Sequence, residues 1–203
     1  AFDKYSWNRY NDSRTGMLPF QRLRRNDDFK MLFADRVYKH LHDDGALTVE
    51  NTIQSFLEIN SQIDKAIVAE SARWGVQAWL EQDRFSPFTR NDEWLPAVNW
   101  VRDQFLPNRT AEILDQFRQV SLYPDTEAPL VLPFGANSAT PIEVSMNTGT
   151  NNSTIYYTTD GTDPRQYNVA TGLGDVAATA QVYTAPIAIS ASKYIRTRVK
   201  NGN

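Results

Sequence analysis

The chain has 203 residues, with 21 Lys and Arg against 24 Asp and Glu, and no Cys. Its net charge of −3 gives no electrostatic reason to expect nucleic acid or an anionic membrane as a partner. Without Cys it forms no disulfide, thiolate zinc site or cysteine nucleophile, and it has no apolar run of the ~18–20 residues that would cross a bilayer. We therefore expect one large domain or two modest ones.

The composition changes near Pro124, and this change predicts a domain boundary. All five Trp and both His precede Pro124, whereas Thr, Ala, Asn, Gly and Val dominate after it. The prolines around this point favour an extended connector. We expect a helical region at residues 1–122, a Pro-rich linker at 123–140 and a β-sandwich at 141–203, and we expect both ends of the chain to be truncations.

The first half predicts amphipathic helices that form a bundle-like arrangement. Asn26 is the expected N-cap of the first helix, and Gly45 its expected left-handed C-cap. Thr48 is the expected N-cap of a second helix, which we expect to end or bend at residues 71–75. Apolar residues recur at positions i, i+3 and i+4 through both segments.

Residues 76–90 show no clear periodicity, and Pro87 favours a loop. Asn91 is the expected N-cap of a third helix, which we expect Pro107 to end. Asn108 is then the expected N-cap of a fourth helix.

The second half predicts short strands separated by Gly, Asn and Pro, as is typical of a β-sandwich. The expected strands are Ile142–Met146, Thr154–Thr158, Gln181–Tyr183, Pro186–Ile189 and Tyr194–Lys200. Between them, Asp160-Gly161 predicts a tight turn because Gly adopts positive φ at little cost. The Gly- and Ala-rich stretch 165–179 is expected to be a long loop.

Two groups of basic residues are possible binding sites. His40 and His42 point to different sides of a helix, so they do not form the i, i+4 pair of a metal site, and we expect His40 in the core and His42 on the surface. The cluster Gln21–Arg25 could hold a phosphate, but we expect it to be solvated or to pair with nearby acids such as Asp27.

Acidic and aromatic residues of the helical half offer two further possibilities. A general acid–base pair would come from the carboxylates Glu50, Glu58, Asp64 and Glu70, but no His, Ser or Lys joins them. A sugar-stacking surface would come from Trp74, Trp79, Trp94 and Trp100, and a Trp-rich core is the expected alternative. Trp7 completes the set of Trp residues.

In the second half, Asp160 and Asp163 could bind calcium within the turn, but no further acid accompanies them, so ordinary turn hydrogen bonding is expected. Glycosylation sequons begin at Asn11, Asn108 and Asn152, and such triplets arise frequently by chance. We assign no catalytic, cofactor-binding or metal-binding residue and expect no cofactor.

The run Ile155–Pro164 reads Ile-Tyr-Tyr-Thr-Thr-Asp-Gly-Thr-Asp-Pro. It resembles the signature of the small Ig-like domain at the C-terminus of chitobiases and β-hexosaminidases. The resemblance implies an accessory module rather than an active site. The predicted fold class is therefore α+β, with an N-terminal all-α domain and a C-terminal Ig-like antiparallel β-sandwich.

Residues Arg24–Tyr123 resemble the C-terminal helical part of the CotH-type, spore-coat protein kinase domain. The resemblance is carried by Asp28–His40, Gly45–Thr48, Ile67–Gly75 and Phe105–Thr110. It implies a large bacterial surface protein in which a CotH domain precedes further modules. In that family the nucleotide- and metal-binding residues come mainly from earlier segments, near which Asp3 and Asp12 fall, and no catalytic residue is carried over.

Three functions remain open. The chain is expected to be a non-catalytic structural or interaction part of a secreted or cell-surface multidomain bacterial protein, whose partners are other domains of that protein or other surface proteins. The first alternative is part of an atypical CotH-type kinase that uses ATP and Mg²⁺. The second is a carbohydrate-binding accessory module that binds a glycan.

Overall fold

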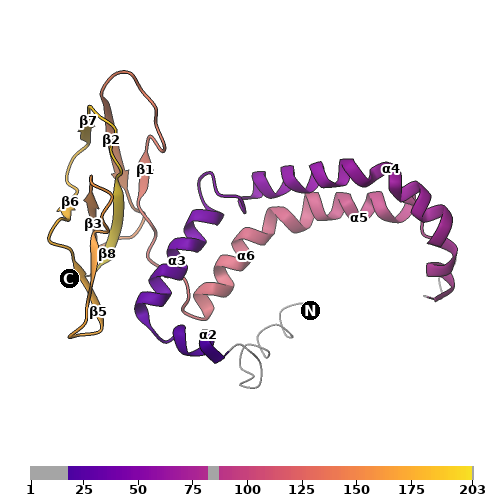
Figure 1. Ribbon diagram of the computed structural model, residues 1–203, viewed down its shortest axis with the longest axis horizontal. Helices are drawn as coiled ribbons and strands as arrows, with labels where there is room; N and C mark the ends of the chain where they lie inside the picture. Colours follow the sequence, from indigo (N-terminus) through magenta and orange to yellow (C-terminus); the bar gives the residue numbers. More distant parts are fainter. Residues whose placement is uncertain (1–17, 82–86, 203) are drawn as a thin grey trace. The chain divides into compact units, whose positions relative to one another are not determined.

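The computed structural model describes residues 18–81 and 87–202 (Figure 1). The chain divides into two compact units. One is Phe33–Tyr123, which we call the helical unit; the other comprises Ala1–Leu32 and Pro124–Asn203, and we call Pro124–Asn203 the β unit. The predicted fold class is confirmed, since a helical region at residues 18–119 precedes antiparallel sheets of an Ig-like type.

The first helix of the described residues is α2 (Leu18–Leu23), and it is followed by α3 (Asp27–Leu41). The Asn26 cap is confirmed, because its Oδ1 accepts a hydrogen bond from the Phe29 N–H at 3.0 Å. The predicted left-handed C-cap of this helix is wrong, because the residue with positive φ is Asp43, at 54°, and not Gly45. Position 45 requires a glycine for a steric reason, since an added Cβ would lie 2.4 Å from the His40 carbonyl oxygen.

The second helix, α4 (Val49–Glu81), is longer than the pattern predicts and does not end at residues 71–75. Its start is as expected, because the Asn51 N–H donates to Thr48 Oγ1 at 3.4 Å. Among the described residues, no helix is long and apolar enough to cross a membrane.

The predicted third and fourth helices are one continuous helix with two π-helical turns. It comprises η1 (Arg90–Trp94), α5 (Leu95–Trp100), η2 (Val101–Phe105) and α6 (Leu106–Gln119). Each π turn is followed within two residues by a proline, Pro96 or Pro107. A π turn rearranges the hydrogen-bond ladder at the point where proline lacks its N–H, so the helix continues past both residues.

Asn91 and Asn108 are consequently not N-caps, which corrects both predictions. The helix starts at Thr89, whose Oγ1 accepts from the Asp92 N–H at 3.0 Å while its own N–H donates to Glu93 Oε2 at 2.6 Å. Asn108 lies inside the helix and donates to the Gln104 carbonyl at 2.7 Å. Figure 1 shows this helix running beside α4 and curving with it.

The core of the helical unit lies where α3 meets α6. It consists of buried Val37, Leu41 and Leu114, with Phe33, Ile113, Phe117 and Tyr123 packed against them. Phe33 and Phe117 meet edge to face, with ring centroids 5.0 Å apart. Farther along, the Asp64 carboxylate ties α4 to η1 by accepting from Arg90 Nε at 2.9 Å.

The β unit contains two three-stranded antiparallel sheets and one hairpin. The first sheet has the order β1-β2-β7, formed by Leu130–Leu132, Ile142–Asn147 and Ile187–Ile189. The second has the order β6-β3-β8, formed by Gln181–Val182, Ser153–Thr158 and Arg196–Asn201. The hairpin pairs β4 (Arg165–Asn168) with β5 (Leu173–Val176).

Two of these features differ from the sequence prediction. Leu130–Leu132, inside the expected linker, form β1 and pair with β2. The expected long loop at 165–179 contains the β4–β5 hairpin. The core of the unit is formed by buried Val144, Met146 and Ile155, with β-branched and aromatic side chains from both sheets around them.

Candidate functional site

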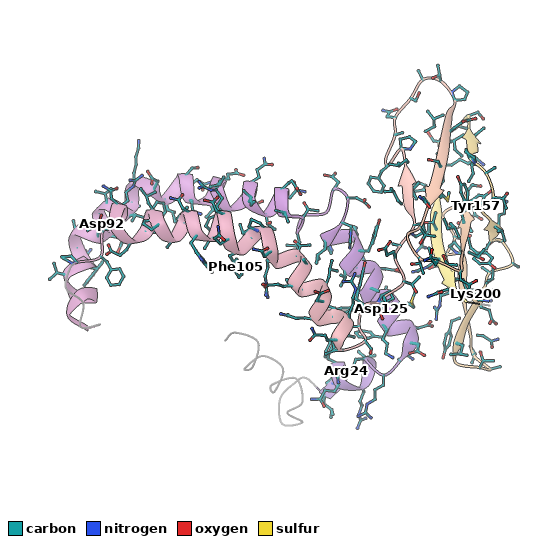
Figure 2. The ribbon with its side chains drawn as sticks, turned by 180° about the vertical axis from the view of Figure 1, so that it is seen from behind. Arg24, Asp92, Phe105, Asp125, Tyr157 and Lys200 are labelled. Carbon is teal, nitrogen blue, oxygen red and sulfur yellow. The ribbon has the colours of Figure 1, made fainter. Side chains whose placement is uncertain are left out.

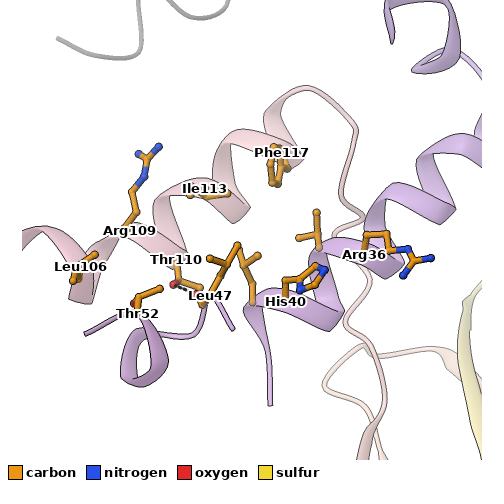
Figure 3. Close-up of a pocket in the computed structure, with 11 residues that line it drawn as sticks. Arg36, His40, Leu47, Thr52, Leu106, Arg109, Thr110, Ile113 and Phe117 are labelled. Carbon is orange, nitrogen blue, oxygen red and sulfur yellow. Dashed lines mark hydrogen bonds between the residues drawn. The ribbon is translucent and has the colours of Figure 1, made fainter. Parts of the chain in front are cut away.

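The helical unit contains an open groove of about 320 Å³ between α3, the segment before α4, and α6 (Figure 3). Six apolar side chains form most of its wall: Val37, Leu41, Leu47, Leu106, Ile113 and Phe117. Four of them belong to the core cluster of the helical unit or pack against it. The groove is therefore an opening onto that core.

Backbone and hydroxyl hydrogen bonds hold the walls of the groove in place. The Leu47 N–H donates to the His40 carbonyl at 2.7 Å, and Thr110 Oγ1 donates to the Leu47 carbonyl at 3.1 Å. Thr52 Oγ1 donates to the Thr48 carbonyl at 2.7 Å. Because both lining hydroxyls already donate to backbone carbonyls, the surface that faces the groove is almost entirely apolar.

The remaining lining residues, Arg36, His40 and Arg109, are all basic. Within the described part of the chain, the Arg36 guanidinium forms no ion pair, and its side chain is exposed. Arg109 lies near Glu112, at 3.5 Å, with a guanidinium 5.7 Å from the Phe105 ring. The groove thus combines an apolar interior with a basic rim and has no carboxylate in its lining.

The positions of the two histidines are the reverse of the prediction. His40 is exposed at the groove, and His42 is half-buried between two tyrosines. Its ring stacks on Tyr38 at 4.6 Å between centroids, and its Nε2 lies 3.3 Å from the Tyr123 hydroxyl. The helical spacing separated the two side chains correctly, but it could not show which side other helices cover.

The Tyr38–His42–Tyr123 stack shifts the pKa values of its members. Burial lowers the pKa of His42, and the nearby Arg118 lowers it further, against an opposing contribution from Asp43. Burial and the Asp43 carboxylate raise the pKa of Tyr38 to about 12. The cluster therefore favours neutral side chains at neutral pH.

The basic cluster and the carboxylates show no catalytic arrangement. Asp27, which we expected near the Gln21–Arg25 cluster, pairs with Lys30 Nζ at 2.9 Å. Asp64 is engaged by Arg90, while Glu50, Glu58 and Glu70 are exposed on α4. In the described ranges, no three His, Asp or Glu side chains lie close enough together to hold a metal ion.

The three Trp side chains that the structure describes do not form the expected core. Trp74 is 47% exposed and Trp100 is 56% exposed, whereas Trp94 is half-buried. Trp100 stacks on Phe105 with centroids 6.0 Å apart, and the Arg73 guanidinium lies 4.8 Å from the Trp74 ring (Phe105 is labelled in Figure 2). The predictions at Trp7, Asp3, Asp12 and Asn11 lie outside the described residues, as does the side chain of Trp79.

The turn after β3 uses its side chains for structure. Asp160 Oδ1 accepts from the Thr162 N–H at 3.0 Å and hydroxyl at 2.6 Å. Thr158, only 2% exposed, donates to the Thr162 carbonyl at 2.6 Å. Gly161 has φ 81°, as the turn prediction required. Asn152, the sequon in this unit, takes φ 53° in the turn before β3.

Asp163 joins this turn to β8. Its carboxylate accepts from the Arg165 N–H at 2.9 Å and from Arg198 Nη2 at 2.6 Å, and Arg196 lies 3.4 Å away. Burial acts to raise the pKa of Asp163, but the hydrogen bonds and charges of these partners lower it overall. A carboxylate held by two guanidinium groups is a structural anchor, and the predicted hydrogen bonding of the turn is present.

Comparison with known proteins agrees with this description of the β unit. Residues 144–203 match the family model described as Fn3 associated. No curated protein and no solved structure matches the chain. The matched segment begins at the buried Val144 of β2 and includes the Tyr156–Pro164 turn and β8. Residues 144–203 therefore form an Fn3-associated domain.

Proposed function

We propose that this chain is a non-catalytic structural and interaction part of a secreted or cell-surface multidomain bacterial protein. The Fn3-associated domain is its accessory module, and the helical unit is the part that meets other domains or partners. The observation that carries this proposal is the family match at residues 144–203, together with a turn whose polar side chains bond to one another.

For the β unit we propose a close relation to the C-terminal Ig-like module of chitobiases and β-hexosaminidases. The support is the Ile155–Pro164 run, whose residues bond internally. Asp160 shapes the turn, Gly161 supplies positive φ, and Asp163 anchors β8. Such residues identify a module by its architecture, because each contributes to the fold rather than to a ligand.

For the helical half we propose a relation to the C-terminal part of a CotH-type domain. The supporting segments coincide with structural landmarks: Asp28–His40 lies on α3, Gly45–Thr48 forms the turn and N-cap of α4, and Phe105–Thr110 joins the end of η2 to the start of α6. The described residues hold neither a phosphate-binding Gly-rich loop nor a cluster of metal ligands.

A nucleotide titration separates the non-catalytic function from the kinase alternative. ATP with Mg²⁺ is titrated into the 203-residue chain by calorimetry, and the expected result is no saturable heat. Micromolar binding would overturn the non-catalytic proposal in favour of the kinase.

The cellular location of the protein is tested separately by protease treatment of intact source cells, since cleavage requires an exposed protein. Recovery of the intact chain only in the cytoplasm would overturn the surface assignment.

Glycan binding is a second candidate because Trp100 and Phe105 present stacked, exposed rings. A glycan array probed with the chain and with Trp100→Ala tests it. A signal lost in Trp100→Ala but retained in the half-buried Trp94→Phe would support the candidate. An absence of signal from the unmodified chain would exclude it for the sugars displayed.

A further inference from the structure

We propose that the groove between α3 and α6 binds a carboxylate that carries a single aliphatic chain. The aliphatic chain of the ligand would lie along the apolar wall of the groove, and its carboxylate would meet a guanidinium at the rim (Figure 3). This assignment is independent of the accessory role of the β unit, since it rests on side chains of the helical unit alone.

The interior of the groove requires an apolar ligand. Its wall is formed by aliphatic and aromatic side chains, and the hydroxyls of Thr52 and Thr110 already donate to backbone carbonyls. A polar group placed there would lose its water without gaining a partner, which costs free energy. An alkyl chain loses nothing by leaving water, so apolar burial favours it.

The rim determines the charge of the head group. Every ionisable side chain in the lining is a base, and in the described ranges Arg36 has no carboxylate partner. The partner of Arg109 is Glu112, at 3.5 Å, and the Glu112 side chain is 59% exposed, so water already competes for this pair. A ligand carboxylate can accept two hydrogen bonds from one guanidinium, which is a stronger arrangement.

The volume of the groove determines the length of the alkyl chain that the ligand can have. Its volume of about 320 Å³ is within the range of small-molecule sites. At about 30 Å³ for each water-sized group, this space holds roughly ten such groups. Decanoate is therefore the appropriate probe. In Figure 3 Arg36 lies at one end of the labelled lining residues and Arg109 lies near the other end, beside Leu106, so an extended alkyl chain can place its carboxylate near either arginine.

The test is calorimetric titration of the full chain with decanoate, decanol and decyltrimethylammonium at low ionic strength. We expect one saturable site for decanoate, with an affinity about three- to tenfold higher than that for decanol. The cationic amphiphile should bind more weakly than decanol. These ligands share one alkyl chain, so differences among them report the head group and need no variant.

Variants then locate the site. Leu47→Glu places a carboxylate in the wall at an exposed position, so it should abolish decanoate binding while the circular dichroism spectrum stays unchanged. Because either arginine can meet the carboxylate, the double variant Arg36→Gln/Arg109→Gln should lower the decanoate affinity to that of decanol and leave decanol binding unaltered. Lys65→Gln removes an exposed positive charge of α4 outside the groove and is the matched control, with no expected effect.

Several outcomes would overturn the assignment. They are the absence of saturable decanoate binding, equal affinities for decanoate and decanol, or an equal loss in Lys65→Gln. A dimer that forms with rising concentration and is abolished by Leu47→Glu would assign the groove to a second copy of the chain. Binding of an acidic amphipathic helical peptide without binding of decanoate would assign it to a protein partner.

Discussion

Charged side chains have different surroundings in the β unit and in the helical unit. In the β unit, the Asp163 carboxylate is enclosed by Arg196, Arg198 and the Arg165 N–H. In the helical unit, the bases Arg36 and His40 border an apolar groove that has no carboxylate in its lining. In the β unit the charges pair within the fold, and in the helical unit the Arg36 guanidinium lies beside an exposed apolar surface.

This difference indicates where a partner or ligand can gain free energy. The turn of the β unit already satisfies its hydrogen-bonding groups, so a ligand there would have to replace internal bonds. The groove offers uncovered apolar surface and donors directed to water, so a ligand there replaces only water. The β unit is thus the region whose turn is internally bonded, and the helical unit is the region to which we assign the proposed ligand.

The largest expected effect comes from the core of the helical unit. Leu114→Ala removes a buried side chain that packs on Val37 and Leu41, and we expect it to lower the free energy of unfolding by about 2–5 kcal/mol. Trp fluorescence in urea reports mainly this unit, because four of the five Trp lie within Phe33–Tyr123. Val68→Ala, at an exposed position of α4, should change stability by less than about 0.5 kcal/mol. Similar losses in the two variants would contradict the assigned core.

The next effect tests whether the β unit depends on its charge cluster. Asp163→Asn keeps the side-chain shape but removes the charge that Arg198 and Arg196 face, and we expect a loss of about 1–3 kcal/mol. Hydrogen exchange of β3 and β8 amides is the measurement, with the exposed Glu143→Gln as control. The pKa of Asp163 is lowered in the folded state, so its contribution is present above pH 3.8 and is lost as the pH falls through the folded pKa. Unchanged exchange would show that the cluster is dispensable.

A smaller effect distinguishes the observed helix start from the sequence prediction. Thr89→Ala removes the oxygen that accepts from the Asp92 N–H, and a lost N-cap lowers stability by about 1 kcal/mol. Asn91→Ala should have almost no effect, because Asn91 lies inside η1. Chemical denaturation followed by helical circular dichroism compares them. The opposite ranking would restore Asn91 as the cap.

The smallest effect is a pH dependence of the helical unit. The pKa of His42 is lowered below its ordinary value of 6.5, so the unfolded chain takes up the proton first. Stability should therefore be full above pH 6.5 and should decrease as the pH falls below it, until the folded pKa is passed. His42→Gln should flatten the stability profile between pH 7 and 5, as measured by Trp-detected thermal unfolding. A slope that persists in His42→Gln would assign it to another group.

Local patterns in the sequence predicted much of the β unit correctly. Alternating residues mark β8, where Val199 packs on the core together with Ile195 just before the strand, and the Asp160-Gly161 pair marks the turn. The β4–β5 hairpin escaped prediction because all four residues of β5 are exposed, so no apolar alternation marks the strand. The short β1 escaped because the prolines around it favour a connector.

In the helical unit the prediction failed at prolines that lie within a helix and where tertiary contacts determine which side chains are buried. Pro107 indicates a helix boundary by the usual rule, and the π turns that precede Pro96 and Pro107 have no sequence pattern that we recognised. The groove also escaped prediction, because it joins Leu41 and Leu47 to Thr110, which lies more than 60 residues farther along the chain. Whether His40 is buried or exposed likewise depends on which side of α3 the core covers.

The two π turns have a consequence for axial register. Two regular helices packed side by side can slide by one helical turn at little cost, because the same ridges and grooves meet again. In this hairpin the irregular turns at Arg90–Trp94 and Val101–Phe105 occupy fixed positions and do not repeat with the α-helical period. Together with the Asp64–Arg90 pair, they define a single alignment of the helix along α4, so a slipped hairpin would place its irregular turns against the wrong side chains.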